Sequence, residues 1–559
     1  MAGKPVPAKP VSPQNTPAAP PSTGGKGNEP VFTLEAPLNR NSPSASTVNS
    51  MADVSSGKKT SEERESRSRR RSSSRSTATT ERLVSLDAFR GFIMMMLAAG
   101  GFGILAFSKI DRSSPVWEVH NWDKWHAIGD HFDHPRWLSV IDRYSVSFWD
   151  LIQPSFMFMV GAAMPFSSLR RESSGQGLFG RTLHAILRSV ALVLLGVFLS
   201  SMGHEKTLWI FPNVLCQIGL GYFFAWVMHH WRAQYQLAAL FVILAGYWGW
   251  FYMNPPAANY DYAAVSASQE NGEIFEGKFA AWSKNANAAY KFDSWLLPRL
   301  RSLEEPAAES DEQNAGAAEA EPATQAEPAT PSTETPAATE TPAAEENADA
   351  NAATVEEAKV AEKPAWYRQW FFLNSEPYKP NTGGYTTLNF IPSIGTTLLG
   401  ILCGQILIRI DLSKWSKLGM LLTGAAICFG LGIAAHEYAC PIVKRIWTPS
   451  WVLFSGGYVI GMLALFYFLF DILPLKLLAF PLVVVGMNSI LIYMMGQTIS
   501  GWMRESIVKV HLAGMIENVF GPKALDPQWY GPITLPSTVF LLYWLFLLWL
   551  YRQRIFLKL

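Results

Sequence analysis

The chain has 559 residues, of which 49% are hydrophobic and only 16% are charged, and its formal net charge is +1. This balance argues against a nucleic-acid partner, because phosphate backbones require a concentrated excess of Lys and Arg. The cysteines exclude a disulfide framework and the ligand spacing of a zinc site, because Cys216, Cys403 and Cys428 fall inside apolar runs and Cys440 stands alone.

The chain begins with a polar tail. Residues 1–80 are rich in Pro, Ser, Thr, Ala and Arg, so they cannot bury enough apolar area to offset the entropy of ordering. We predict a disordered cytoplasmic tail. Its basic string RESRSRRRSSSR lies next to an apolar run, where it is typical of a topology signal or of contact with lipid headgroups.

Long apolar runs follow in two groups, one in residues 82–300 and one in residues 366–559. Each run has roughly 18 to 25 residues, which at a helical rise of 1.5 Å per residue crosses a hydrocarbon core of about 30 Å. Backbone N–H and C=O groups inside a bilayer must form hydrogen bonds within the protein, so these runs are predicted to be helices. We therefore predict an all-α membrane protein, a bundle of about ten transmembrane helices, at residues 86–108, 147–168, 183–202, 209–231, 236–253, 388–410, 417–435, 450–471, 474–499 and 534–551.

A second low-complexity segment separates the two groups. Residues 303–364 repeat Ala, Glu, Pro and Thr and contain no aromatic residue. This composition predicts a disordered acidic insert that is dispensable for chemistry.

The distribution of Lys and Arg predicts the orientation, because cytoplasmic loops are enriched in these residues. If the N-terminal flank is cytoplasmic, every short loop on that side carries positive charge, and the basic C-terminus lies there too. The long segments 109–146, 254–387 and 500–533 are then expected on the outer side, as walls of an outward-facing site.

Ionisable residues inside a membrane are costly, so they usually line a cavity or form an ion pair. Asp87 and Arg90 share a helical face at the cytoplasmic end of the first span and are close enough to pair. Two interpretations stay open for them, a structural ion pair and a site for an anionic cytoplasmic ligand.

Asp150 lies about one turn inside the outer end of the second span and needs a partner there. The preceding outer loop offers several histidines, of which His134 could fold back over the span, so that the carboxylate would fix its tautomer. Acid/base catalysis by one histidine, a metal site and plain surface histidines are the interpretations for His120, His126, His131 and His134. Their spacings match no standard metal-ligand pattern, so no metal is predicted.

Two amides also fall inside predicted spans, Asn389 in the sixth and Asn488 in the ninth. Such groups either hold helices together, at about 0.6 kcal/mol each, or take part in a site. Close helix packing is expected at five glycines, Gly161, Gly400, Gly404, Gly456 and Gly457.

Six strings in fixed order carry a resemblance to a known family. They are SLDAFRGF, FWDLIQPSFMFMVG, NVLCQIGLGY, NFIPSI, PIVKRIWTPSWVL and GMNSILIY. Together they resemble the heparan-alpha-glucosaminide N-acetyltransferase family, particularly its bacterial branch, over nearly all of residues 82–559 apart from the acidic insert.

The resemblance implies a transmembrane acyltransferase that moves an acetyl group from cytoplasmic acetyl-CoA to the amine of a glucosamine on the far side, here of a bacterial inner membrane. The family's functional histidine lies in an H-x-x-W pattern of the first outer loop, which His134 and Trp137 match. The chain departs from the family in two places. The string LSVIDRYSV looks like an insertion after Trp137, and Ala98 or Ala99 stands where the family carries an asparagine that bears on acceptor specificity.

On this hypothesis the phosphates of acetyl-CoA bind near Arg90 and neighbouring basic loop residues, so that Asp87 and Arg90 are the cofactor-binding candidates, and the acceptor sugar or glycan arrives from outside. His134, oriented by Asp150, would remove a proton from an attacking amine or hydroxyl. Asn389 or Asn488 would donate a hydrogen bond to the developing oxyanion. Acetylation of His134 itself, in a two-step transfer, is an open alternative.

Two other functions stay open. A transporter or flippase for a lipid-linked sugar or small polar solute would also use intramembrane Asp, Arg and Asn, although no internal repeat relates the two halves of the sequence. A scaffold protein would account for the low-complexity segments but not for the polar residues inside the spans.

Overall fold

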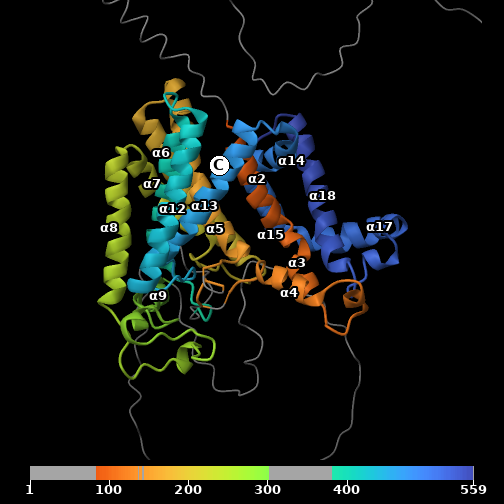
Figure 1. The fold of residues 1–559 in the computed structure, drawn as a ribbon, viewed down its shortest axis with the longest axis horizontal. Helices are drawn as coiled ribbons and strands as arrows, with labels where there is room; N and C mark the ends of the chain where they lie inside the picture. The colour runs from red at the N-terminus through yellow and green to blue at the C-terminus, as the bar shows by residue number, and fades with distance from the viewer. Residues whose placement is uncertain (1–82, 136, 142–143, 301–380, 558–559) are drawn as a thin grey trace, which may run out of the picture. The chain divides into compact units, whose positions relative to one another are not determined.

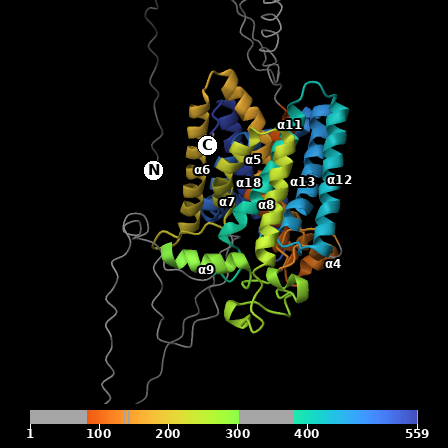
Figure 2. The same cartoon turned by 90° about the vertical axis from the view of Figure 1, so that its left-hand side faces the viewer.

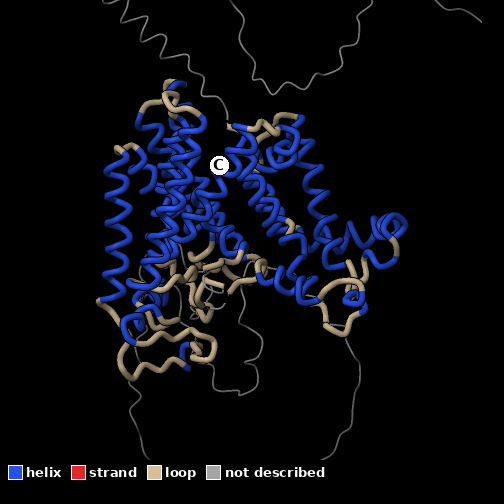
Figure 3. The backbone as a smooth tube through the Cα atoms, in the orientation of Figure 1, coloured by secondary structure: helices blue, strands red, loops and turns tan. Residues whose placement is uncertain are grey.

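The computed structural model describes residues 83–135, 137–141, 144–300 and 381–557. The predicted disordered tail (1–80) and acidic insert (303–364) lie outside these residues. The chain divides into two units, Met1–Ser74 and Arg75–Leu559, and the described residues belong to the second. These residues form helices and connecting loops without a β-strand (Figure 3), so the predicted all-α fold is confirmed for the described part of the chain.

The helices follow one another in two halves. The first half contains α2 (Val84–Ala98), η1 (Gly100–Gly103), α3 (Ile104–Ser108), α4 (Trp122–Asp130), α5 (Phe148–Ser173), α6 (Leu178–Ser201), α7 (Val214–His229), α8 (Ala233–Tyr252) and α9 (Ala288–Leu300). The second half contains α11 (Phe390–Ile408), α12 (Lys414–Tyr438), α13 (Pro449–Tyr467), η6 (Phe468–Ile472), α14 (Lys476–Met487), α15 (Ser489–Thr498), α16 (Ser500–Trp502), η7 (Met503–Leu512), α17 (Ala513–Phe520) and α18 (Gly531–Arg552). Short 3-10 turns occur in the loops.

Several helices are long and apolar enough to cross a membrane. Within the described residues five qualify, namely α6, α11, α12, α13 and α18, and the number rises to seven if the bent pairs α2 with α3 and α14 with α15 each count as one span. The three other predicted runs coincide with α5, α7 and α8, which fall short of that length or hydropathy. These helices indicate a membrane protein.

The apolar helices differ in how they are covered. In their most apolar windows, 67% of α11 and 61% of α13 is buried, compared with 22% of α6 and 17% of α12. Figures 1 and 2 show α12 and α13 running side by side, and Figure 2 shows α6 at the opposite side of the bundle. Because α6 and α12 turn apolar side chains such as Leu187 and Ile427 outward, their free faces suit a lipid environment.

Glycines bring the central helices into backbone contact. A Cβ added at Gly161 of α5 would overlap the carbonyl of Thr397 on α11, and one added at Gly400 of α11 would overlap that of Phe158 on α5. Gly404 meets the α5 backbone in the same way. The prediction that these glycines mark close helix packing is confirmed, as small residues allow such approach in membrane bundles.

The first and ninth predicted spans are broken rather than continuous, which corrects the predicted helix over 86–108. Gly100, Gly101, Phe102 and Gly103 all have positive φ, and this left-handed stretch bends the axis between α2 and α3 by 53°. Between α14 and α15 the axis bends by 69° at Asn488, whose φ of −121° and ψ of 42° are not helical.

The bundle has two ends, which we name after residues of α5 and its neighbours. The His134 end is where α5 begins, after the N-cap formed by Ser147, whose hydroxyl accepts from the Trp149 N–H. The Arg181 end is where α5 finishes and α6 begins. Most connecting loops in Figure 3 lie at the His134 end, near α4 and α9.

Candidate functional site

Three ionisable side chains from distant segments meet at the His134 end. His134 Nδ1 lies 2.6 Å from Asp150 Oδ1, and Lys444 Nζ lies 2.9 Å from the same oxygen. Lys444 Nζ is also 3.2 Å from His134 Nδ1. The side chains of Asp150 and Lys444 are only 2% and 6% exposed, and that of His134 is 17% exposed. The structure therefore brings together the predicted pair and adds a buried lysine to it.

The donors and acceptors of this cluster define the state of the imidazole. An ammonium group only donates, so Asp150 accepts from Lys444. The 2.6 Å contact to His134 requires a proton between the two atoms, which places an imidazole hydrogen on Nδ1; in the neutral imidazole the lone pair is then on Nε2. With a neutral imidazole the charges of Asp150 and Lys444 cancel, which is how a buried ion pair becomes tolerable.

Backbone contacts hold His134 over Asp150. The Ser147 hydroxyl donates to the carbonyls of His131 and Asp133 at 2.9 and 2.6 Å, which closes the loop that carries His134 onto the start of α5. Within the inserted string, Ile141 and Ser145 form an antiparallel bridge. The extra residues thus leave the histidine next to the second predicted span.

The segment between α12 and α13 presents Lys444. Its backbone N–H donates to Ser139 Oγ at 2.9 Å, and the N–H of Ser139 donates to the Ile442 carbonyl at 2.9 Å, which ties this segment to the His134 loop. Thr448 caps α13 by accepting from the Trp451 N–H. These contacts fix the backbone at Lys444, so that its side chain reaches Asp150 from one direction.

Asn389 supports the same segment. Its Nδ2 donates to the carbonyl of Arg445 at 2.5 Å, and its Oδ1 accepts from the Thr386 hydroxyl at 2.6 Å. The neighbouring Arg445 guanidinium donates to the carbonyl of Gly383 at 2.9 Å. These hydrogen bonds make Asn389 a positioning residue, because it holds the backbone next to Lys444.

A small apolar cluster packs beside the site. Trp137 is buried in it with Trp282 and Val443, and its indole N–H donates to the Trp282 carbonyl at 3.0 Å. Cys440 belongs to this cluster, and burial raises the pKa of its thiol to about 11. A thiol with that pKa stays protonated near neutral pH, so Cys440 offers no thiolate nucleophile.

The other predicted histidines lie elsewhere. His120 Nε2 is 3.0 Å from the Tyr530 hydroxyl, His126 stacks on Trp122, and His131 contributes its backbone carbonyl to the loop closure. Within the described residues no group of three or more His, Cys, Asp or Glu side chains is arranged to hold a metal ion.

Asp87 and Arg90 belong to α2, and Asn488 lies at the break between α14 and α15, both of which contact α2. Asp87 and Arg90 form an ion pair of 3.6 Å near the start of α2. Asn488 Nδ2 donates to the Ile555 carbonyl and its Oδ1 accepts from the Leu557 N–H, so its amide holds the C-terminal segment. These three residues are not brought to His134.

Ala98 and Ala99, one of which the resemblance matches to an asparagine, end α2 at the left-handed stretch. Next to them, a Cβ added at Gly101 would meet the rings of Phe132 and Trp149, which flank the site in sequence. The break between α2 and α3 therefore lies beside the candidate site.

Lys444 is the residue that the sequence reasoning missed. A signal existed, because Lys444 and Arg445 are adjacent basic residues in a short loop that the predicted orientation places on the outer side. Such loops are depleted in positive residues, so this pair needed an explanation of its own.

A comparison with models of known protein families gives no match to this chain, and a comparison with curated proteins gives none either. The likeness to the N-acetyltransferase family therefore rests on the six sequence strings alone.

Proposed function

We propose that this chain is a transmembrane acyltransferase that moves an acetyl group from acetyl-CoA on the cytoplasmic side to an amino sugar or glycan on the other side of a bacterial inner membrane. The observation that carries the proposal is the contact of His134 with Asp150 and Lys444. About ten spans, with both termini cytoplasmic, are part of the same proposal.

The chemistry assigns one role to each side chain. His134 Nε2 takes a proton from the acceptor amine as its nitrogen attacks the thioester carbonyl carbon. The carbon–sulfur bond then breaks, and the imidazolium returns the proton to the departing CoA thiolate. Asp150 holds the imidazole in the tautomer with hydrogen on Nδ1, and Lys444 neutralises Asp150 while the imidazole is uncharged.

A two-step route uses the same atoms. His134 Nε2 attacks the thioester first, CoA leaves, and the acceptor amine then displaces the acetyl group from the imidazole. In this route Asp150 keeps the Nδ1 hydrogen in place while Nε2 carries the acetyl group. Single-turnover experiments with labelled acetyl-CoA and no acceptor distinguish the routes, because only the two-step route labels the protein.

A transporter or flippase for a lipid-linked sugar or small polar solute is the second candidate. The bends of 53° between α2 and α3 and of 69° between α14 and α15 favour it, because transporters often bind substrates at discontinuous helices. Solute flux in proteoliposomes, measured with and without acetyl-CoA, separates the two functions.

The test of the proposal is acetyl transfer by the purified full chain in lipid nanodiscs, with labelled acetyl-CoA and glucosamine. We expect His134→Ala to lower the rate at least about a hundredfold, the contribution of a well-placed general base. His126→Ala is the matched control, because His126 lies in the same loop but stacks on Trp122. Equal rates in the two variants would refute the assignment of His134.

A further inference from the structure

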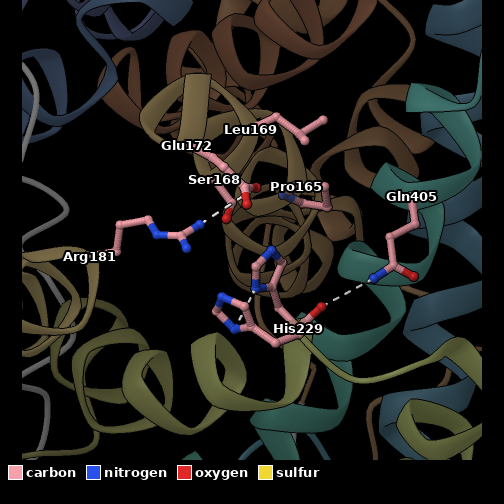
Figure 4. A pocket seen from close by; sticks show the side chains of 8 residues that line it. Pro165, Ser168, Leu169, Glu172, Arg181, His229 and Gln405 are labelled. Carbon is pink, nitrogen blue, oxygen red and sulfur yellow. Dashed lines mark hydrogen bonds and ion pairs between the residues drawn. The ribbon is translucent and has the colours of Figure 1, made fainter. Parts of the chain in front are cut away.

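A cavity opens at the Arg181 end, far along α5 from the site described above. It has a volume of about 280 Å³ and is lined by Pro165, Ser168, Leu169, Glu172, Arg181, His229, His230 and Gln405 (Figure 4). A smaller adjoining hollow shares Ser168 and Arg181 with it and adds Arg171 and His184. We call the two together the Arg181 cavity.

The walls of the Arg181 cavity carry more positive than negative charge. Arg171 and Arg181 contribute two guanidinium groups, whereas Glu172 is the carboxylate among the lining residues. Arg181 Nη1 lies 3.7 Å from Glu172 Oε2, and the Glu172 side chain is 62% exposed, so this pair is weakly held. One positive charge therefore remains uncompensated by the lining residues when the histidines are neutral.

The Arg181 guanidinium retains an unused donor. Its Nε is buried, yet it has no hydrogen-bond partner among the described residues. Leaving a buried donor unsatisfied costs about 1–3 kcal/mol, so such a group is a natural contact for a ligand. The planar fork of arginine matches two oxygens of a phosphate group.

Hydrogen bonds fix the orientation of the polar side chains next to Arg181. The Arg171 guanidinium donates to His184 Nε2 at 2.5 Å, which fixes its direction. His230 Nδ1 lies 2.9 Å from the Trp226 carbonyl and donates to it, so His229 Nδ1, 3.1 Å away, faces a donor and its own ring hydrogen belongs on Nε2. These contacts fix the directions of the Arg171 guanidinium and of the His229 ring at the cavity.

We infer that the Arg181 cavity binds a phosphate group of an anionic ligand, with Arg181 and Arg171 as the principal donors. At about 280 Å³ the cavity is at the lower limit of small-molecule sites, so it suits a phosphate head and not a whole dinucleotide-sized cofactor. The phosphate belongs either to a soluble nucleotide-containing thioester donor or to a phospholipid headgroup.

The test uses the full chain in nanodiscs and two probes. Coenzyme A binding in phosphatidylcholine nanodiscs is measured by equilibrium dialysis, and retention of phosphatidylglycerol is measured by native mass spectrometry. We expect one of the two probes to bind at least about tenfold more weakly to Arg181→Gln and to Arg171→Gln, the effect of losing a charged hydrogen bond. Arg409→Gln is the matched control, because Arg409 pairs with Asp411 at the end of α11 and does not line the cavity.

Each outcome has a definite meaning. A loss confined to coenzyme A supports the site and identifies the soluble ligand, and a loss confined to phosphatidylglycerol supports the site and identifies the lipid. The inference is overturned if the binding of each probe weakens by less than about twofold in Arg181→Gln and in Arg171→Gln. Size-exclusion profiles and thermal unfolding show that both variants are folded. His134→Ala is expected to bind both probes as the unmodified chain does, so this result and the acetyl-transfer result are independent.

Discussion

At the His134 end the buried carboxylate of Asp150 contacts both Lys444 and His134 beneath hydrogen-bonded loops, whereas at the Arg181 end two guanidinium groups and one exposed carboxylate line an open cavity. The first arrangement fixes a tautomer, which is what proton transfer requires. The second leaves charge and a buried donor unsatisfied, which is what anion binding requires. The difference separates the two proposals, since a variant at one end should not reproduce the defect of a variant at the other.

The largest effect is expected from removing the charge of Lys444. Lys444→Met leaves Asp150 buried without its cation, and breaking a buried ion pair in this way costs about 3–5 kcal/mol of stability. The measurement is the free energy of unfolding of the purified protein in detergent. Lys278→Met is the control, because Lys278 is an exposed lysine that donates to a backbone carbonyl.

The double variant Asp150→Asn with Lys444→Met sharpens that result. Removing both charges together should recover much of the stability that Lys444→Met loses, because no uncompensated charge remains. A Lys444→Met protein as stable as Lys278→Met would show that the compensation at the His134 end is not needed.

A smaller effect is expected at the two asparagines. Asn389→Ala leaves the Arg445 carbonyl without its side-chain donor, which should cost about 1–3 kcal/mol and also lower the acetyl-transfer rate. Asn488→Ala should lower stability by a similar amount with little change in rate, because its amide holds the C-terminal segment. A rate more sensitive to Asn488 than to Asn389 would contradict the positioning role of Asn389.

The smallest effect is expected at Arg90. Arg90→Gln should change the affinity for coenzyme A by less than about twofold, because Asp87 already pairs with Arg90 and partly exposed ion pairs contribute little. Equilibrium dialysis of this variant beside Arg181→Gln gives the comparison. A larger loss in Arg90→Gln than in Arg181→Gln would move the phosphate site to Asp87 and Arg90.

The sequence predicted the helices and the partner of Asp150 because both depend on local information. Apolar runs of the right length are visible directly, and His134 is separated from Asp150 by only 16 positions. A carboxylate near the end of a span needs a partner, and His134 is the nearest in sequence of the four histidines in the preceding loop.

The sequence did not predict that Lys444 contacts Asp150 or which residues the Asn488 amide contacts. Lys444 is 294 positions from Asp150, and no periodicity tells which distant loops meet. Hydropathy placed Asn488 inside a span but gave no information on which neighbour its amide faces. The break after α2 was also hidden, because a hydropathy average over 86–108 includes Gly100, Gly101 and Gly103 without registering their left-handed backbone.

The glycine contacts between α5 and α11 limit how the protein can move. Gly161 and Gly400 let the two backbones touch, so sliding one helix along the other would drive side chains into backbone. The two helices therefore move together as one rigid unit. Asp150 lies near one end of α5, and Ser168 lies about 27 Å further along it at 1.5 Å per residue. Any opening toward either side of the membrane has to come from movement of the helices that surround α5 and α11.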